Sequence, residues 1–229
     1  PWAMVQSERF RNMVIRGFHT ELEAVYEEFN MSLTNDFEKM NNALYAILFP
    51  HHPYGTQTTI GTQQHLKNPS LRNVMQYYRE WYVPNNVAIC MSGDLDPDET
   101  VRIIEKYFGD WQPSDSLPKR IFPQEKPLEA PVSVDVVGME TPMVALGWRL
   151  PAKADPQYGI MSVVQQILTN GKCGLFDENL NNAQQVMQAM TFLDGMTDQS
   201  AFWAIGCPKE GQSLEEVRDL MLSQVRLLV

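Results

Sequence analysis

The sequence predicts an α+β fold made of two similar repeat units, each with an antiparallel sheet and with helices packed on one side of it. Three observations predict this class. Segments with apolar residues at helical spacing alternate with short apolar runs typical of strands. A proline-rich stretch separates two halves. The order buried strand, polar turn, capping box and amphipathic helix occurs once in each half, which suggests duplicated units.

The sequence of the first half predicts four helices and one strand. Apolar residues recur at helical spacing over residues 8–30 and 35–48, and a third helix is expected at 70–82. Residues 86–93 form a compact apolar run with a glycine at its end, which predicts a buried strand. Residues 96–108 begin with Asp-Pro and a capping box, so a fourth helix is expected there.

The second half follows a linker. Residues 112–131 contain five prolines and little periodicity, typical of a linker or an extended segment. We therefore divide the chain into a domain at 1–115, a linker at 116–131 and a second domain at 132–229. The second domain is expected to contain strands at 132–137, 143–150, 184–194 and 200–208, and helices at 155–169 and from the N-cap Ser213 onward, where Glu216 takes the capping-box position.

Composition excludes several classes of function. The formal net charge is −10, which argues against a nucleic-acid backbone or an anionic membrane as the main partner. No apolar run approaches the length of a membrane span. The cysteines Cys90, Cys173 and Cys207 are far apart and odd in number, so they predict neither a disulfide framework nor a metal-binding pair. We interpret them as buried free thiols, without a predicted role.

The two ends of the sequence predict a piece of a longer protein. The chain begins with "PWAMVQSERF", which has neither an initiator methionine nor a signal peptide. It ends within an amphipathic helical pattern that carries no stop signal. The lack of a targeting segment therefore says nothing about localisation.

The segment "ELEAVYEE", residues 21–28, carries four acids on an expected helix. Glu21 and Glu28 are seven residues apart and lie on nearly the same line, beside the apolar stripe, whereas Glu23 and Glu27 fall on the opposite face. Glu21 and Glu28 are therefore expected to turn toward the interior. A buried carboxylate needs compensation by an arginine, a lysine or a metal ion.

Two alternatives to this interpretation stay open. Glu21 and Glu28 could lie at the edge of the stripe and reach solvent. His19 and Glu23, four residues apart, could hold a metal ion, although two ligands on an exposed face are a weak pattern. The remaining histidines lie in loop sequence without ligand spacing, and we interpret them as polar surface or turn residues; they are His51, His52 and His65.

Several motifs give the chain a specific resemblance to the pitrilysin/insulinase family of zinc peptidases, mainly over residues 2–111 and less sharply from Val132 onward. The matching residues are Glu21 and Glu28, His52-Pro53-Tyr54-Gly55, Gly61-Thr62, Tyr82-Pro84-Asn85, Gly93-Asp94, and Phe108-Gly109-Asp110-Trp111. The resemblance implies a chain of similar α+β domains. Residues 1–115 would be the C-terminal part of a first, catalytic-type domain, and 132–229 a truncated, non-catalytic repeat.

The resemblance also implies a zinc site. In this family two histidines of an inverted HxxEH motif and a later glutamate hold Zn2+, and the glutamate of the motif activates a zinc-bound water. Glu28 resembles the distal zinc ligand, and Glu21 the supporting acid behind it. The sequence contains no HxxEH. We expect that motif upstream of Pro1, so this chain by itself should be inactive and should not bind zinc tightly.

Two hypotheses about function remain. The first is that the chain is a fragment of a zinc-dependent metalloendopeptidase that hydrolyses peptides or unfolded polypeptides. The alternative is a non-catalytic family member that acts as a structural or partner subunit. Both acids are present, which favours the first. Other expected partners are the missing domains of the same chain and, through apolar surface at the cut ends, further copies of this chain. The resemblance suggests the bacterial periplasm or cell envelope.

Overall fold

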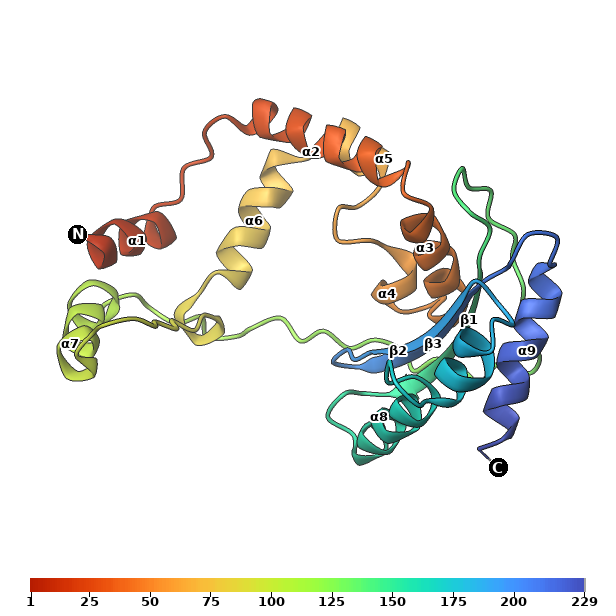
Figure 1. The fold of residues 1–229 in the computed structure, drawn as a ribbon. Coiled ribbons are helices and arrows are strands. Elements are labelled where there is room, and N and C mark those ends of the chain that lie inside the picture. Colours follow the sequence, from red (N-terminus) through yellow and green to blue (C-terminus); the bar gives the residue numbers. More distant parts are fainter. Residues whose placement is uncertain (229) are drawn as a thin grey trace. The chain divides into compact units, whose positions relative to one another are not determined.

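The structure is a computed structural model that describes residues 1–228. These residues form two compact units, and the chain crosses from one to the other after Phe29, after Thr59 and after Phe122. The first unit contains Pro1–Phe29 and Ile60–Phe122, and the second contains Asn30–Thr59 and all described residues from Pro123 onward. The elements in Figure 1 are α1 (Trp2–Arg11), α2 (Phe18–Ser32), α3 (Asp36–Leu48), α4 (Pro53–Thr56), α5 (Gln63–Lys67), α6 (Leu71–Trp81), the 3-10 turn η1 (Pro84–Asn86), α7 (Pro97–Phe108), β1 (Val144–Pro151), α8 (Pro156–Leu168), the π-helical segment η2 (Asp177–Asn182), β2 (Gln188–Asp194), β3 (Gln199–Cys207) and α9 (Leu214–Arg226).

The first unit begins with two helices where the sequence predicts one over residues 8–30. That prediction is wrong because α1 ends at Arg11 and α2 starts only at Phe18. Gly17, between them, has a φ of +65°, a left-handed conformation that does not occur inside a helix. The break separates Phe10 from the apolar residues of α2.

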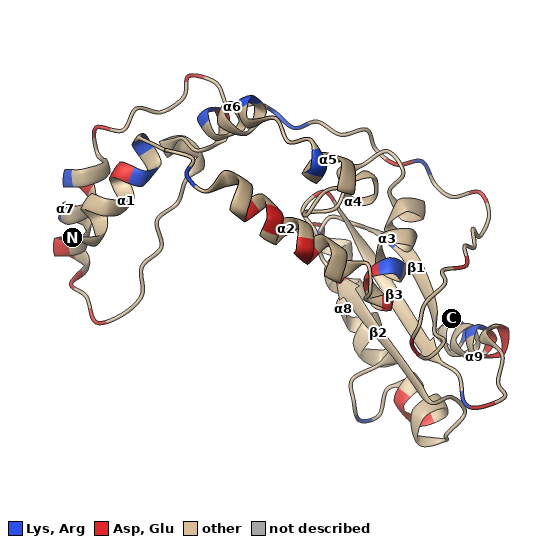
Figure 2. Cartoon of the chain, turned by 90° about the horizontal axis from the view of Figure 1, so that it is seen from above, with Lys and Arg blue, Asp and Glu red and all other residues tan. Residues whose placement is uncertain are grey.

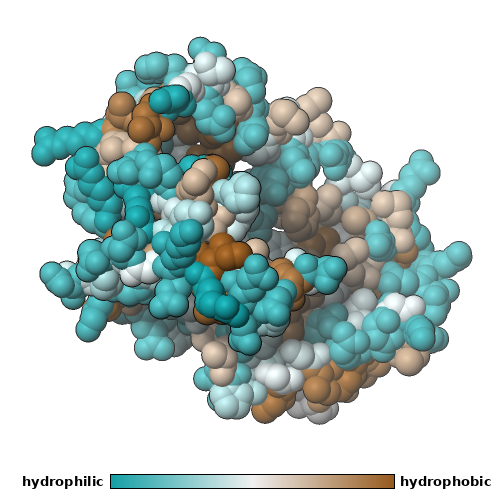
Figure 3. Space-filling model, turned by 90° about the vertical axis from the view of Figure 1, so that its left-hand side faces the viewer, coloured by the Kyte–Doolittle hydropathy of each residue, from teal (hydrophilic) through white to brown (hydrophobic). Residues whose placement is uncertain are grey.

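Helices α1, α6 and α7 of the first unit meet through aromatic and polar contacts. The ring centroid of Phe10 lies 5.7 Å from that of Trp111, and the Tyr78 hydroxyl donates to the carbonyl of Phe10 over 3.0 Å. The Arg11 guanidinium donates to the Asp110 carboxylate. Ala3 is nevertheless the only buried apolar residue among the described residues of this unit. Hydrophobic residues also reach the surface, and they lie between hydrophilic ones on the face in Figure 3.

The expected strand at 86–93 is absent. In that run Ile89 and Met91 are 39% and 40% exposed, and among residues 1–228 no segment pairs with it. The segment 132–137, also expected to be a strand, is exposed and without strand structure. An apolar alternating sequence becomes a strand only when a neighbouring strand supplies hydrogen bonds. The helix after the first run does form as expected, with Asp96 accepting from the Glu99 backbone over 2.8 Å.

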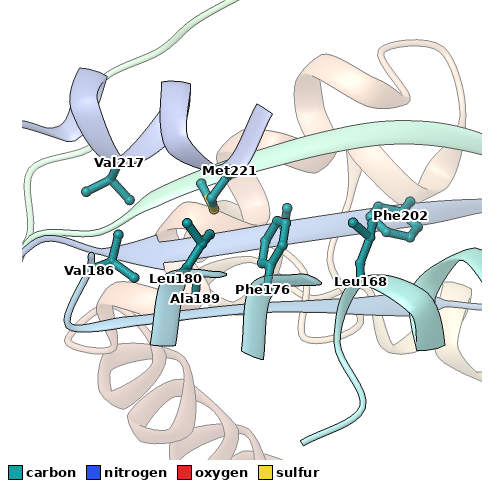
Figure 4. Packing of buried hydrophobic residues seen from close by; sticks show 9 residues of the cluster. Leu168, Phe176, Leu180, Val186, Ala189, Phe202, Val217 and Met221 are labelled. Carbon is teal, nitrogen blue, oxygen red and sulfur yellow. The ribbon is translucent and has the colours of Figure 1, made fainter. Parts of the chain in front are cut away.

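The second unit is built on a three-stranded antiparallel sheet in the order β1-β3-β2. All residues of β3 from Ser200 to Gly206 are buried, because helices cover both faces of this central strand. Ala201, Trp203 and Ile205 pack against α3. Phe202 and Ala204 face the opposite cluster, drawn in part in Figure 4. Its other buried members come from α8, from η2 and the residues beside it, from β2 and from α9; they are Leu168, Phe176, Leu180, Val186, Ala189, Val217 and Met221.

The predicted α+β class with an antiparallel sheet is confirmed. Two details differ from the prediction. Helices pack on both faces of the sheet, and the described residues of the first unit contain helices without a sheet. The local signals at helix ends are accurate: Asp155 caps α8, and Ser213 and Glu216 form the capping box of α9. The division at 1–115, 116–131 and 132–229 stays a prediction.

Asp36, the first residue of α3, holds the chain just before β1. Its Oδ2 accepts from the backbone N–H groups of Met139 and Glu140 over 2.5 and 2.6 Å, and its Oδ1 accepts from Lys39 over 2.9 Å. A Cβ at Gly138 would lie 2.3 Å from the same Oδ2, so only glycine permits this approach. The hydrogen bond from Lys39, followed by those from the backbone, holds the pKa of Asp36 below its ordinary value.

The first prediction concerns Trp203, which is 1% exposed and stacks on Phe192 at a centroid distance of 5.4 Å. Trp203→Ala should reduce the free energy of unfolding by about 3–5 kcal/mol, because it leaves a cavity between α3 and the sheet. Trp148→Ala is the control, since Trp148 is 37% exposed on β1. Urea unfolding measures both. Equal losses would contradict the packing described here.

A second prediction concerns the pH dependence of Asp36. Its folded pKa lies below its unfolded value, so its contribution to stability is present above about pH 4 and is lost as the pH falls through the folded pKa. Asp36→Asn should therefore lower the urea midpoint at pH 7. The difference from the original chain should shrink as the pH is lowered from 4 to 2. A difference that stays constant with pH would show that the charge is unimportant.

Candidate functional site

Helix α2 carries the acids that the sequence singles out. Its fifteen residues contain four glutamates and no lysine or arginine, and none of its residues is buried. Acidic residues are marked along this helix in Figure 2. The half-buried residues Leu22, Val25, Tyr26 and Phe29 form a narrow stripe. The helix is therefore mostly solvent-exposed in this chain, with a strongly acidic surface.

Glu21 and Glu28 are both exposed, and so are Glu23 and Glu27. The expectation that Glu21 and Glu28 turn toward the interior is wrong. Because α2 begins at Phe18, its stripe runs through Leu22 and Phe29. Glu21 and Glu28 then lie about 100° from the stripe on one side, whereas on its other side Glu23 lies about 110° and Glu27 about 150° away. The alternative, that the acids reach solvent at the edge of the stripe, describes the structure.

A hollow of about 730 Å³ lies beside α2, on the side of Glu23 and Glu27. Helix α5 forms its other wall with Leu66 and Lys67. The side-chain amide of Gln63 in α5 donates to the Tyr26 hydroxyl over 2.9 Å, which ties the two helices together. Neither Glu21 nor Glu28 lines this hollow.

The donor atoms present do not fit a zinc ion by themselves. A protein zinc site needs at least three side-chain ligands. Within the described chain, no three histidine, cysteine, aspartate or glutamate residues come together in a way that could hold a metal ion. His19 and Glu23, which the sequence offers as a possible metal-binding pair, are therefore not part of such a group. The assignments of Glu28 as a zinc ligand and Glu21 as its supporting acid stay predictions.

The His-Pro-Tyr-Gly motif, residues 52–55, joins α3 and α4 to the turn between β2 and β3. His52 is 1% exposed; its Nδ1 accepts from the Tyr54 backbone over 3.2 Å, and its Nε2 lies 3.3 Å from Asp198 Oδ2. The Tyr54 hydroxyl accepts from the Asp198 backbone N–H over 3.2 Å. The sequence interpretation of His52 as a polar loop residue therefore misses its burial and its long-range partner.

Gly55 completes this motif through its small size. A Cβ at this position would lie 2.3 Å from the Tyr45 carbonyl oxygen and 2.4 Å from that of Phe49, so α4 can pack this closely on the end of α3 only with glycine. The Tyr45 hydroxyl also donates to Asp194 Oδ2 over 2.5 Å. Burial, reinforced by this carboxylate, raises the pKa of Tyr45 well above its ordinary value.

His51, next to the motif, binds Glu125, which lies within the predicted linker at 116–131. The Glu125 carboxylate accepts from the His51 backbone over 2.7 Å and lies 3.0 Å from its Nδ1. Burial raises the pKa of Glu125, but the two interactions with His51 outweigh it, so the pKa lies below the ordinary value. Both adjacent histidines therefore have acidic partners that are distant in sequence, which no local pattern could indicate.

The other matching motifs are helix ends and turns. Thr62 and His65 form the capping box of α5. Asn85 exchanges two hydrogen bonds with the Ser114 backbone, at 3.0 and 3.1 Å, and fixes the turn after α6. Asp110, in the Phe-Gly-Asp-Trp motif, accepts from Arg11. Each of these contacts fixes a helix end or a turn within the first unit.

The three cysteines are free, as predicted, but the expectation that they are buried is wrong for all three. Cys90 and Cys173 are exposed and Cys207 is half-buried. Burial raises the pKa of the Cys207 thiol. Cys90 is exposed because the run around it has no strand partner.

Comparison with known proteins identifies the family. The model of the peptidase M16 inactive domain matches residues 70–229, which is more than half of the chain. The zinc protease PqqE of Helicobacter pylori is 23% identical over 161 residues, covering 67% of this chain and 35% of that protein. A protease crystal structure from Helicobacter pylori aligns over 99% of this chain and 56% of its own, with a TM-score of 0.82 at 18% identity. The periplasmic protease PqqL of Escherichia coli aligns over 99% and 28%, with a TM-score of 0.71 at 17% identity.

The chain therefore belongs to the peptidase M16 family, and the resemblance to pitrilysin and insulinase is confirmed. Because the sequence identities to these solved structures are low, the structural likenesses show the fold alone. The chain spans about a third of the curated relative PqqE. Residues 1–69, which include Glu21 and Glu28, lie outside the range that the family model matches. Among the described residues, no helix is both long and apolar enough to cross a bilayer.

A third prediction tests the role of the motif at residues 52–55. Gly55→Ala should destabilise the chain by about 1–3 kcal/mol, because the added methyl group meets two backbone oxygens that cannot move independently. Gly159→Ala in α8 is a matched control with no atom within 4 Å of the new Cβ, and it should stabilise by about 0.5–1 kcal/mol. Thermal unfolding of both variants is the measurement. A neutral Gly55→Ala would mean that the packing of α4 on α3 is loose.

Proposed function

We propose that this chain is part of a zinc-dependent metalloendopeptidase and that α2 supplies acids to its metal site. Membership of a family whose relatives are named zinc proteases supports this proposal. The observation that carries it is the pair Glu21 and Glu28, spaced by two helical turns on an exposed helix without lysine or arginine. In the proposal Glu28 is the distal zinc ligand and Glu21 orients the groups around it.

The proposed activity belongs to the complete polypeptide and not to this chain alone. The chain has no HxxEH motif, and its described residues do not assemble a metal site. The substrate class is a peptide or an unfolded polypeptide, and the other domains of the polypeptide would supply the histidine ligands and the general base. We also propose a periplasmic location, supported by the fold shared with the periplasmic protease PqqL.

A second candidate is a non-catalytic subunit that pairs with an active one. The matching family model favours it, because that model describes an inactive domain. The two candidates differ in the upstream sequence. An intact HxxEH there identifies an enzyme, whereas loss of either histidine identifies a partner subunit.

The fourth prediction compares three glutamate variants in the complete polypeptide. Glu28→Gln should remove a charged ligand and abolish most zinc-dependent peptide hydrolysis. Glu21→Gln should cost about 10–100-fold, as is typical of residues that orient metal ligands. Glu23→Gln is the control, matched in charge, exposure and helix, and should be nearly neutral. Bound zinc and hydrolysis of an unstructured peptide are measured together.

Measuring bound zinc and peptide hydrolysis together shows which part of the proposal is wrong. A variant at Glu28 that keeps both zinc and activity would refute its assignment as a ligand. Severe loss with Glu23→Gln would place the site on the side of the hollow between α2 and α5. A complete polypeptide without zinc and without hydrolysis would favour the partner-subunit function.

A further inference from the structure

The loop between α8 and η2 contains a dipeptide that is chemically reactive in unfolded chains. Asn170 is the only asparagine in the sequence that precedes a glycine. In such a pair the backbone nitrogen of the glycine can attack the side-chain amide of the asparagine, because glycine has no side chain that hinders the approach. Asn170 and Gly171 are both exposed, so water and hydroxide reach them. Sequence and exposure alone therefore predict a site of spontaneous deamidation.

The reaction has two steps. Hydroxide removes the proton from the Gly171 nitrogen, which then forms a bond to Cγ of Asn170. The bond between Cγ and Nδ2 breaks, and Nδ2 takes up a proton from water and leaves as ammonia. Water then opens the five-membered ring at one of its two carbonyls and leaves an aspartate or an isoaspartate. The attack therefore requires a Gly171 nitrogen and an Asn170 amide that can turn toward each other.

The Asp177 carboxylate holds the backbone of this loop from the inside. Its Oδ2 accepts from the N–H groups of Asn170 and Gly171 over 2.9 Å and from that of Gly174 over 3.1 Å. Asp177 is 7% exposed, and a Cβ at Gly174 would lie 2.8 Å from the same oxygen. The Gly171 N–H therefore points at a carboxylate, and the negative charge that the attack requires on this nitrogen is disfavoured there.

The side chain of Asn170 is held as well. Its Oδ1 accepts from the backbone N–H groups of Lys172 and Cys173, each over 3.0 Å. Its Nδ2 donates to the Gln166 carbonyl over 2.9 Å. The amide must leave all three partners before Cγ can turn toward the Gly171 nitrogen. Both reacting groups are therefore withdrawn from the attack in the folded loop.

Both ends of the loop are anchored in the core of the second unit. Leu168 before the loop and Phe176 after it are 1% and 0% exposed, and both belong to the cluster in Figure 4. Between these anchors the loop is short, and Gly171 adopts a left-handed φ of +75°. The hydrogen bonds to Asp177 are therefore lost only when the loop opens locally or when the whole unit unfolds.

We propose that Asn170 is a site of spontaneous deamidation and that the Asp177 carboxylate keeps it unreactive while the loop is folded. Opening of the loop, or loss of Asp177, releases the Gly171 nitrogen and starts the reaction. The change runs in one direction because ammonia is lost. The product lacks the Nδ2 donor to Gln166 and brings a second carboxylate toward Asp177, so the modified loop does not rebuild the same contacts.

The first experiment follows the unchanged chain at neutral pH by mass spectrometry of its peptides, in buffer and in concentrated guanidinium chloride. Asn170 should deamidate at least about 10-fold more slowly in the folded chain, because the reaction there requires local opening. Equal rates in the folded and denatured chains would overturn the proposal. Asn170→Gln identifies the site, since this variant should yield no deamidated peptide from the loop.

A variant of Asp177 tests whether its carboxylate is the cause. In Asp177→Ala the folded chain should deamidate at Asn170 at least about 10-fold faster than the unchanged chain. Asp155→Ala is the matched control, because it removes a carboxylate that caps the other end of α8, and its rate at Asn170 should stay unchanged. An unchanged rate in Asp177→Ala would overturn the proposal. So would a slower rate, because the carboxylate would then promote the reaction.

Amide hydrogen exchange by NMR separates local opening from unfolding. In the unchanged chain Gly171 should exchange at least about 10-fold more slowly than Gly211. Gly211 is also exposed with a left-handed φ of +78°, and no printed contact within residues 1–228 occupies its N–H. Equal exchange of the two glycines would overturn the proposal even if Asp177→Ala does not fold. In a folded Asp177→Ala chain, Gly171 should lose its protection while Trp203 keeps it.

Discussion

The burial of Trp203 between the sheet and α3 is the interaction on which the second unit depends. The indole stacks on Phe192 within the sheet and lies 5.8 Å from the Tyr45 ring, so one side chain joins β2, β3 and α3. Because α3 is fixed here, the residues at both of its ends are fixed as well. Asp36 then holds the connection before β1, and His52 reaches the turn after β2.

The recognisable motifs therefore preserve architecture more than chemistry. Residues 52–55 combine a buried histidine, a tyrosine hydroxyl and a glycine without space for a side chain, and each sets the approach of α4 to its neighbours. The acids of α2 differ because they are exposed and have no such packing role. We propose that the exposed pair Glu21 and Glu28 acts at a metal site that other residues complete.

The sequence predicts well what is determined locally. The caps at Asp155 and Ser213 involve residues within three positions of each other, and both helices begin as expected. The prediction of a strand at 86–93 is wrong because a strand depends on a partner strand that its own sequence does not specify. The predicted burial of Glu28 is wrong because the left-handed residue Gly17 interrupts the expected helix. A new helix begins after it, and the apolar stripe of that helix no longer includes Phe10 and Val14. The contacts of His52 with Asp198 link residues 146 positions apart, beyond any local pattern.

We propose that this chain contributes acids to a zinc site that it cannot form alone. Its acids lie on one exposed helix, and zinc binding requires ligands from more than one segment. The most direct test is the zinc content of this chain and of the complete polypeptide, purified side by side without chelator. We expect about one zinc ion per complete polypeptide and no stoichiometric zinc in this chain. Equal stoichiometric zinc in both would contradict it.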